Sequence, residues 1–160
     1  RYKNMIKILF ICHGNICRSP MAEFLLKHMV REQGLQDQFR VASAATSREE
    51  IGNPVYPPAR RKLAELGIST TGKTAVQMTK SDYDKYDYVI VMDENNMRNA
   101  LRLVGRTRTE AAKLHKLLDF ADKHGDIADP WYTGDFDTAF SEIEKGCSGF
   151  LEHLKKEGMI

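Results

Sequence analysis

The chain has 160 residues, of which 42% are hydrophobic and 29% are charged, which suits one domain with a single substantial core. With 24 Lys and Arg against 22 Asp and Glu, the formal net charge is only +2. Dedicated nucleic-acid or membrane binders carry surfaces of one sign, so we expect neither partner. The longest apolar run, from Ile8 to Cys12, is far shorter than the roughly 20 residues of a membrane span. These values argue against membrane insertion.

Two further features concern the cellular compartment. Residues 1–4 lead straight into an apolar run without a small-residue cleavage site, so we expect no export signal. Three cysteines at uneven spacing are an odd number and do not make a disulfide framework. We therefore expect a reducing, cytoplasmic setting in which each thiol needs its own explanation.

The first half of the chain alternates strand and helix signals. Residues 5–11 form an almost continuous apolar run, typical of a central parallel strand buried on both faces. Ser19 and Pro20 then start a helix whose end we place at Gly34. Residues 39–44 alternate between apolar and polar side chains and predict a second strand.

The second half continues this alternation. Several prolines precede a predicted helix at 59–65, which Gly67 closes. We place a third strand at 88–92, with Asp93 at its carboxyl end, and a candidate fourth strand at 117–120. Apolar side chains from residue 136 to residue 154 recur every three or four positions and predict a final amphipathic helix. The pattern is that of an open α/β sheet, which binds ligands at the carboxyl ends of its strands.

The loop from Cys12 to Ser19 follows the first strand and immediately precedes a helix. Glycine and asparagine permit the backbone to turn there, and the free amides of a helix start point towards a common anion. We expect this loop to bind phosphate. Arg18 follows Cys12 by six residues, and its planar guanidinium is suited to two phosphate oxygens at once.

The same amides stabilise a thiolate, so we expect Cys12 to be ionised at neutral pH and ready for in-line attack on phosphorus. The Ser19 hydroxyl is placed to donate a hydrogen bond to this sulfur. A lone cysteine at a strand end is usually a small core residue, but the spacing C-x5-R-S between a strand and a helix is far more specific.

The two other cysteines have different interpretations. Cys17 and Cys12 are spaced like two zinc ligands, but no second pair of Cys or His follows, which argues against a metal site. Cys17 is instead predicted to line the loop, and oxidation could join it reversibly to Cys12. Cys147 falls on the apolar face of the final helix and is predicted to be a core residue.

A general acid is needed to protonate the departing oxygen, and Asp129 is the candidate. It is followed by Pro130, which stiffens the chain, and by two aromatic residues, Trp131 and Tyr132, which could form walls for a flat substrate ring. Taken alone, the segment also reads as a common Asp-Pro turn before a helix. The occurrence of this segment together with the cysteine loop favours the role of general acid for Asp129.

These residues resemble a known family, the low-molecular-weight protein tyrosine phosphatases. The resemblance rests on ILFICHGNICRSPMAE near the N-terminus and DPWYTGDF near the C-terminus, and it spans essentially the whole chain as one domain, residues 1–160. It implies a four-stranded parallel sheet with helices on both faces and a two-step reaction that needs no metal and no cofactor. Its phosphate loop would comprise His13, Gly14, Asn15, Ile16, Cys17, Arg18 and Ser19.

The resemblance also implies roles for single residues. Cys12 would attack phosphorus, Arg18 would bind the phosphoryl oxygens, and Asp129 would first protonate the tyrosine oxygen and then activate water. Asn15 would brace the loop, and Ser19 would serve the thiolate. The implied partners are phosphotyrosine-containing proteins, with a cognate tyrosine kinase as a candidate, and the chain would be a monomer or weak dimer.

The sequence departs from the family in four places. Many members carry a His after the position of Ile68, but residues 69–74 contain none, so Asn15 must be braced differently. Many members place an aromatic residue beside the substrate where this chain reads Arg48-Glu49-Glu50. That substrate wall is therefore either missing or replaced by negative charge, with Glu49 as its candidate residue. His13 occupies a position that is often aliphatic, and Trp131 replaces the first of two adjacent tyrosines.

Three alternatives are less well supported by the residues. An arsenate reductase of the same fold needs two further cysteines for its redox relay, and none lies between Cys17 and Cys147. A phosphocysteine carrier protein needs neither Arg18 nor a general acid. A non-catalytic phosphate-binding module would not need nucleophile, arginine and acid together.

Overall fold

A four-stranded parallel sheet forms the centre of the structure, a computed structural model that describes residues 5–160. The strands are β1 (Ile6–Cys12), β2 (Phe39–Ala45), β3 (Tyr88–Val91) and β4 (Leu114–Lys116), in the spatial order β2-β1-β3-β4. The predicted α/β class and parallel sheet are confirmed. Residues 1–4 lie outside the described residues. The predicted domain boundary at residue 1 and the expected absence of an export signal both fall on this segment.

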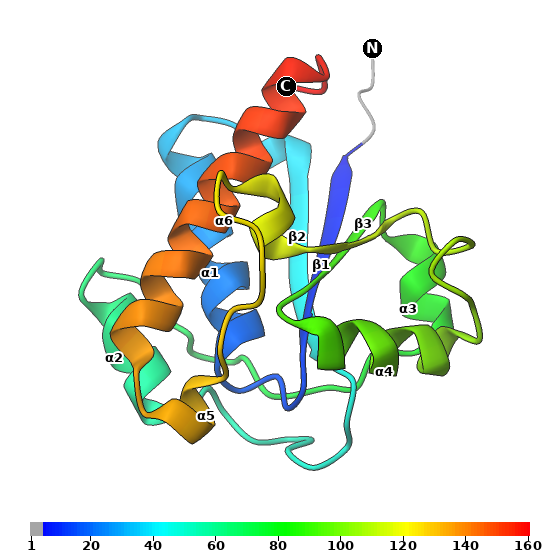
Figure 1. The fold of residues 1–160 in the computed structure, drawn as a ribbon. Coiled ribbons are helices and arrows are strands. Elements are labelled where there is room, and N and C mark those ends of the chain that lie inside the picture. The colour runs from blue at the N-terminus through cyan, green and yellow to red at the C-terminus, as the bar shows by residue number, and fades with distance from the viewer. Residues whose placement is uncertain (1–4) are drawn as a thin grey trace.

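Helices cover both faces of this sheet (Figure 1). On one face lie α1 (Arg18–Glu32), α2 (Pro57–Ala64) and α6 (Phe136–Lys156), and on the other lie α3 (Lys80–Lys85) and α4 (Glu94–Val104). The short helix α5 (Pro130–Thr133) sits beyond the carboxyl ends of the strands, and single 3-10 turns occur at Gln36–Gln38 and Leu117–Phe120.

Strand β1 is buried on both sides because its side chains alternate between two cores. Ile8 and Phe10 belong to the core beneath α1 and α6, whereas Leu9 and Ile11 belong to the core beneath α4. All four are at most 2% exposed. Burying such a side chain contributes on the order of 1.5–3 kcal/mol, so this segment is fixed firmly in the sheet centre. Its carboxyl end, Cys12, is thereby held in place for the loop that follows.

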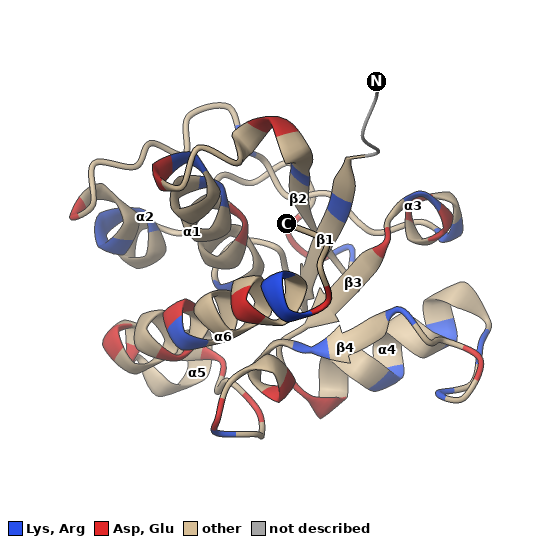
Figure 2. Cartoon of the chain, turned by 90° about the horizontal axis from the view of Figure 1, so that it is seen from above, with Lys and Arg blue, Asp and Glu red and all other residues tan. Residues whose placement is uncertain are grey.

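The outer surfaces of the helices are charged, as the sequence pattern predicted for the last one. Figure 2 shows basic and acidic residues interspersed along α6, while the strands are largely free of charge. The predicted helices at the start, at 59–65 and at the C-terminal end are confirmed to within a few residues. None of the helices within residues 5–160 combines the length and the apolar character needed to cross a bilayer.

The prediction of a strand at 117–120 was wrong. The fourth strand is Leu114–Lys116, and Leu117–Phe120 is a 3-10 turn that packs against α6. Leu117 fills the space above Gly146, where an added Cβ would lie 2.4 Å from the leucine side chain. Leu117 and Leu118 are buried by this packing, and an apolar pair buried in a turn has the same sequence pattern as a pair in a strand.

Candidate active site

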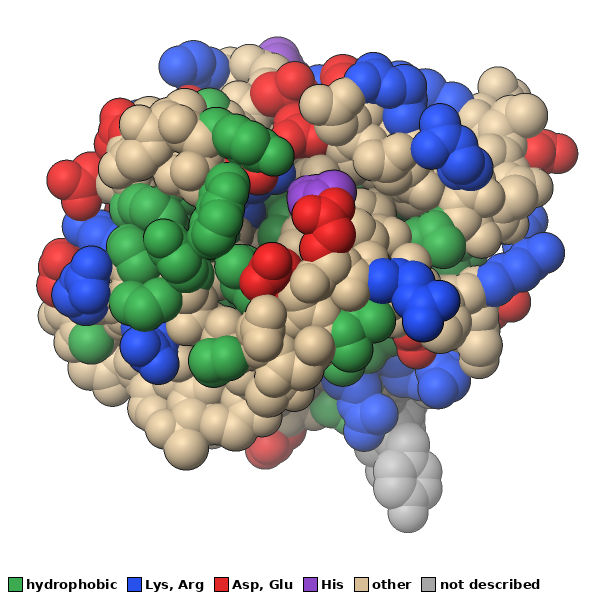
Figure 3. Space-filling model, turned by 90° about the horizontal axis from the view of Figure 1, so that it is seen from below, with side chains coloured by type: hydrophobic (Ala, Val, Ile, Leu, Met, Phe, Trp, Pro, Cys, Tyr) green, Lys and Arg blue, Asp and Glu red, His purple; other side chains and the backbone are tan. Residues whose placement is uncertain are grey.

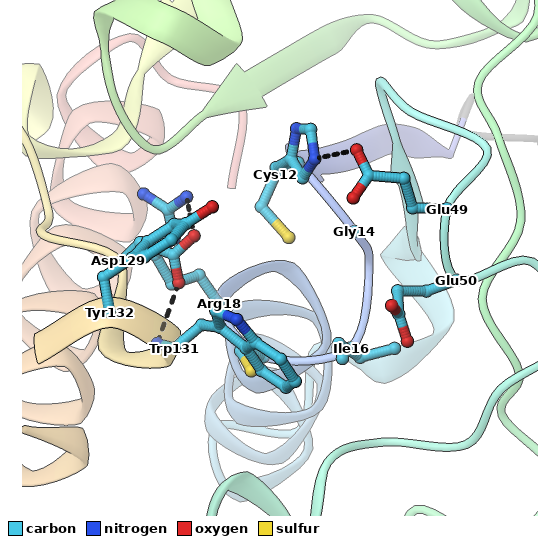
Figure 4. Close-up of a pocket in the computed structure, with 11 residues that line it drawn as sticks. Cys12, Gly14, Ile16, Arg18, Glu49, Glu50, Asp129, Trp131 and Tyr132 are labelled. Carbon is cyan, nitrogen blue, oxygen red and sulfur yellow. Dashed lines mark hydrogen bonds and ion pairs between the residues drawn. The ribbon is translucent and has the colours of Figure 1, made fainter. Parts of the chain in front are cut away.

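The loop between β1 and α1 forms a cup around the sulfur of Cys12, which is 3% exposed. The backbone N–H of Asn15 donates to Cys12 Sγ at 3.3 Å, and Ser19 Oγ lies 3.0 Å from the same sulfur. Both contacts were expected of a site that holds a thiolate, since each stabilises negative charge on sulfur. The sulfur points into the open pocket of Figure 4.

Asn15 holds the cup in shape from behind. Its φ of 60° lies in the left-handed region, which asparagine tolerates better than most residues. Its side-chain amide donates to Ser19 Oγ at 2.8 Å and to Ser43 Oγ at 2.9 Å, and its Oδ1 accepts from the backbone N–H of Val76 at 3.1 Å. The side chain thus ties the loop to β2 and to the segment before α3.

Arg18 begins α1 and lies at the floor of the pocket, 2% exposed. Nη1 donates to Asp93 Oδ2 at 2.6 Å and to the carbonyl of Ile127 at 2.7 Å, and Nη2 lies 3.3 Å from Asp129 Oδ2. Burial opposes the charge of this guanidinium, but the negative charges of Cys12 and the two aspartates outweigh it and raise the pKa of Arg18. A permanent cation therefore lies beside the nucleophile candidate.

The two carboxylate oxygens of Asp129 have different partners. One carboxylate oxygen, Oδ1, accepts from the N–H of Trp131 at 3.0 Å and caps α5, as a turn residue would. The other, Oδ2, faces Arg18 within the same pocket as Cys12 (Figure 4). Its side chain is 21% exposed, so it is fixed by two partners yet open to solvent and substrate.

The mouth of the pocket has two unlike sides. Trp131 and Tyr132 are 51% and 81% exposed on one side, and Glu49 and Glu50 lie on the other (Figure 4). Figure 3 shows hydrophobic side chains gathered beside a hollow, with a histidine and acidic side chains adjoining it. His13 Nε2 lies 2.7 Å from Glu49 Oε2, which joins the phosphate loop to the opposite loop.

All the predicted site residues, apart from Asn15 and Ser19, line this one pocket, and those two lie directly behind it. Three residues were missed. Asp93 stands at the carboxyl end of β3, a position that the strand pattern had marked without assigning it a role. Ser43 and Tyr56 carried no sequence signal, although Tyr56 supports the Trp131 ring at a centroid distance of 4.8 Å.

The remaining cysteines are thiols. Cys17 is 4% exposed, and burial first, then the negative charges of Cys12 and Asp129, raise its pKa far above its ordinary value. Cys147 is fully buried in the core, as predicted, and burial likewise raises its pKa. Within residues 5–160, no group of three or more His, Cys, Asp or Glu side chains is arranged to hold a metal ion.

A cysteine in a cup of phosphate-binding shape, beside an arginine and a carboxylic acid, is the arrangement of a cysteine-dependent phosphatase. Comparison with known proteins agrees. The family described as low molecular weight phosphotyrosine protein phosphatase matches residues 7–159.

Individual relatives match along almost their whole length. The chain is 37% identical over 158 residues to the low molecular weight protein-tyrosine-phosphatase YfkJ of Bacillus subtilis, covering 98% of this chain and 100% of that protein. It is 38% identical over 148 residues to the human low molecular weight phosphotyrosine protein phosphatase, covering 91% and 93%.

Solved structures show the same fold. The crystal structure of Bacillus subtilis YfkJ has a TM-score of 0.92 at 35% identity and covers 98% of this chain and 99% of that one. The crystal structure of DARP, a Drosophila arginine phosphatase, has a TM-score of 0.84 at 30% identity and covers 94% and 98%. The chain belongs to the low-molecular-weight protein tyrosine phosphatase family and is a cysteine-dependent hydrolase of phosphotyrosine.

Proposed function

We propose that Cys12 is the nucleophile of a two-step hydrolysis. In the first step Cys12 Sγ forms a bond to phosphorus and the bond between phosphorus and the tyrosine oxygen breaks. The contacts of the sulfur support this role, because the Asn15 N–H and the Ser19 hydroxyl can stabilise a thiolate before attack and as the leaving group afterwards.

Arg18 and the amides of residues 13–18 hold the phosphoryl oxygens in this proposal. Their work is electrostatic, because charge spreads over the equatorial oxygens in the transition state. The ion pairs of Arg18 with Asp93 and Asp129 support this role, since they fix a cation at the pocket floor before substrate arrives.

Asp129 supplies the proton transfers. It gives a proton to the departing tyrosine oxygen in the first step, which leaves a phosphocysteine and a free tyrosine hydroxyl. In the second step it takes a proton from water as the water oxygen bonds to phosphorus, and the bond between sulfur and phosphorus breaks. Its place in the same pocket as Cys12 supports both transfers.

The observation that carries this proposal is the convergence of Cys12, Arg18 and Asp129 on one pocket from three distant parts of the chain. The rival chemistries lack such support. A redox relay of the arsenate reductase kind needs further accessible thiols, and Cys147 is 0% exposed. A phosphoryl carrier has no use for a proton donor at the pocket.

Comparing substrates tests the proposal. We expect steady, metal-independent release of phosphate from p-nitrophenyl phosphate and from phosphotyrosine peptides. The reason is that the exposed side chains of Trp131 and Tyr132 offer aromatic walls to an aryl ring. Phosphoarginine is the matched competitor, since a structural neighbour is named for that substrate. Release of one p-nitrophenol per chain, with the phosphoryl group retained on the protein and no further turnover, would instead indicate a carrier. Faster turnover of phosphoarginine would contradict the aryl preference.

We also propose cytoplasmic phosphotyrosine proteins as the substrates, with a cognate tyrosine kinase as the candidate partner, and a monomer or weak dimer as the working state. Support comes from the family and from the free thiols of the described residues. A substrate-trapping pull-down with Asp129→Ala, read by mass spectrometry, would identify the substrates. Sedimentation at several concentrations would measure the oligomeric state.

A further inference from the structure

A second cavity lies beside the phosphate loop and shares one wall with the proposed active site. It is an open cavity of about 470 Å³, and its lining residues come from the phosphate loop, the segment after β2 and the helix α4: His13, Thr46, Ser47, Asn99, Arg102 and Leu103. His13 also lines the pocket that holds Cys12, so the two cavities adjoin at this side chain. The proposed reaction uses none of the other residues.

The backbone of this cavity is bonded directly to the strand and loop that carry the nucleophile. The N–H of Thr46 donates to the carbonyl of Cys12 at 3.0 Å. The N–H of Ser47 donates to the carbonyl of His13 at 3.1 Å. An extended peptide advances about 3.3 Å per residue, so a side chain that is close in sequence to the phosphotyrosine can enter this cavity while the phosphoryl group is bound at Cys12.

Thr46 brings an unpaired hydroxyl group to the cavity. The residue is 7% exposed, and within residues 5–160 its Oγ1 is the one buried side-chain oxygen or nitrogen atom that has no hydrogen-bond partner. Buried hydroxyl groups are normally paired with protein, with ordered water or with a ligand. Because this exception lies beside the substrate pocket, it indicates that a polar group from outside the fold completes the hydrogen bonding of Thr46.

Arg102 gives the cavity a positive charge. It is exposed on α4, and its Nη1 donates to Asn99 Oδ1 at 3.1 Å. No carboxylate of residues 5–160 forms an ion pair with Arg102, whereas Arg108, shortly after the same helix, donates to both oxygens of Glu94. Figure 3 shows further Lys and Arg side chains beyond the central histidine, on the side away from the hydrophobic cluster. A guanidinium without an acidic partner is suited to the oxygens of an incoming anion.

We propose that this cavity is a specificity subsite, in which Arg102 and the Thr46 hydroxyl bind the carboxylate of an acidic side chain that flanks the phosphotyrosine of the substrate. A carboxylate accepts hydrogen bonds on both oxygens and can therefore engage both partners at once. Glu49 and Glu50 line the active-site pocket but not this cavity, so an acidic side chain is favoured on the Arg102 side of the loop. The inference rests on the proposed reaction with phosphotyrosine proteins.

Matched peptides measure the preference. Alanine-based peptides with a central phosphotyrosine carry one Glu at each flanking position in turn, and each reference peptide carries Gln at the same position. At the positions that reach the cavity, we expect kcat/KM to favour Glu over Gln about fivefold, the upper end for an exposed ion pair. The gain should lie in KM, because the contact is made equally before and during the reaction, and it should shrink in high salt.

Substitutions on α4 test the role of the guanidinium. Arg102→Gln removes the charge, and we expect the preference for Glu to disappear. Arg98→Gln is the matched control, because Arg98 lies one turn earlier on α4, is also exposed and also donates to an asparagine, yet does not line the cavity. This variant should keep the wild-type ratio of Glu to Gln peptides.

Thr46→Val tests the hydroxyl group, because valine keeps the shape of the side chain. We expect the ratio of Glu to Gln peptides to fall about threefold, the effect of one lost hydrogen bond. The Tm should not fall, because the hydroxyl has no partner among the described residues. Each ratio is taken within one variant, so a general loss of activity does not affect it.

Several results would overturn the inference. These are the absence of a Glu preference in the wild type at every position, a preference retained in folded Arg102→Gln, or an equal loss in Arg98→Gln. An unchanged ratio in Thr46→Val also overturns it, and that variant decides if Arg102→Gln does not fold. If Gln peptides are hydrolysed without a Glu preference, only the subsite fails. If no phosphotyrosine peptide is hydrolysed, the proposed function fails, and the inference fails with it.

Discussion

In the proposed reaction, two side chains act on the two ends of the phosphorus–oxygen bond that breaks. Cys12 attacks the phosphorus, and Asp129 protonates the departing oxygen. Their environments differ accordingly. Cys12 is 3% exposed as a residue, and its sulfur is contacted by the loop, whereas the Asp129 side chain is 21% exposed and is held by Arg18 and by the start of α5. Two substitutions separate these roles.

Replacing the nucleophile should abolish turnover without emptying the anion site. In Cys12→Ser the hydroxyl is a far weaker nucleophile at neutral pH, but Arg18 and the loop amides remain in place. We expect no measurable release from p-nitrophenyl phosphate, with phosphate binding retained in calorimetry. Substantial hydrolysis in this variant would refute the assignment of Cys12.

Replacing the general acid should lower kcat more for substrates with a poor leaving group than for substrates with a good one. A poor leaving group such as tyrosine needs the proton, so Asp129→Ala should lose about 10²- to 10⁴-fold in kcat with phosphotyrosine. A p-nitrophenolate ion leaves without help, and the loss should shrink with that substrate. An equal loss for both substrates would mean that Asp129 matters only as the cap of α5.

Structural elements bring the site residues together from afar. The loop after β1 supplies Cys12, Asp93 follows β3, and Asp129 precedes α5, so the carboxyl ends of parallel strands and one late loop meet at a common edge. Helices α3 and α4 were not predicted, although both carry start signals. Thr79 and Asp82 form a capping box, and Asp93 caps α4.

Because α6 packs closely on the turn at Leu117–Phe120, we expect a glycine-to-alanine substitution in this helix to destabilise the protein rather than stabilise it. Glycine to alanine in a helix interior normally stabilises by about 1 kcal/mol. At Gly149, however, a Cβ would lie 2.0 Å from the carbonyl oxygen of Phe120, which belongs to the backbone and cannot rotate away. We expect Gly149→Ala to lower the free energy of unfolding by about 1–3 kcal/mol, the cost of overpacking.

Urea denaturation measures this effect. The exposed neighbour Ser148 provides the control, and Ser148→Ala should change stability by no more than about 0.5 kcal/mol. A stabilised Gly149→Ala variant would show that α6 can shift away from the turn without cost.

In the molecule as a whole, phosphate binding should be coupled to stability, because the proposed phosphate loop is built from the end of β1 and the start of α1 and exists only in the folded chain. Phosphate at about 100 times its Kd should therefore stabilise the fold by about 2.7 kcal/mol. For a chain of this size that corresponds to a rise in Tm on the order of 5 to 10 °C.

Calorimetry with and without phosphate checks this expectation. Cys12→Ser should keep the rise in Tm, whereas Arg18→Ala should lose most of it, because the buried guanidinium is the main cation of the pocket. A full rise in Arg18→Ala would place the anion elsewhere on the molecule.

Much of this protein was determined by its sequence alone. The apolar run 5–11 predicted the central strand, and the spacing from Cys12 to Arg18 predicted a loop at its carboxyl end, because both patterns depend on residues that are neighbours in the chain. The fourth strand was misplaced because Leu114–Lys116 carries a His and a Lys and is stabilised by pairing with β3 rather than by its own apolar pattern.

Only the tertiary structure decided how distant polar groups pair. No local pattern indicated that Asp93 would hold Arg18, that Ser43 would join Asn15 to a buried Glu23, or that Lys73 would lie 3.8 Å from the same Glu23. Such contacts form between residues up to 111 positions apart, and their partners are chosen by the packing that brings strand ends and loops to one edge of the sheet. The sequence determines which chemical groups are present and how neighbouring ones are spaced. The distances between groups far apart in the chain are set only when the core packs and excludes water.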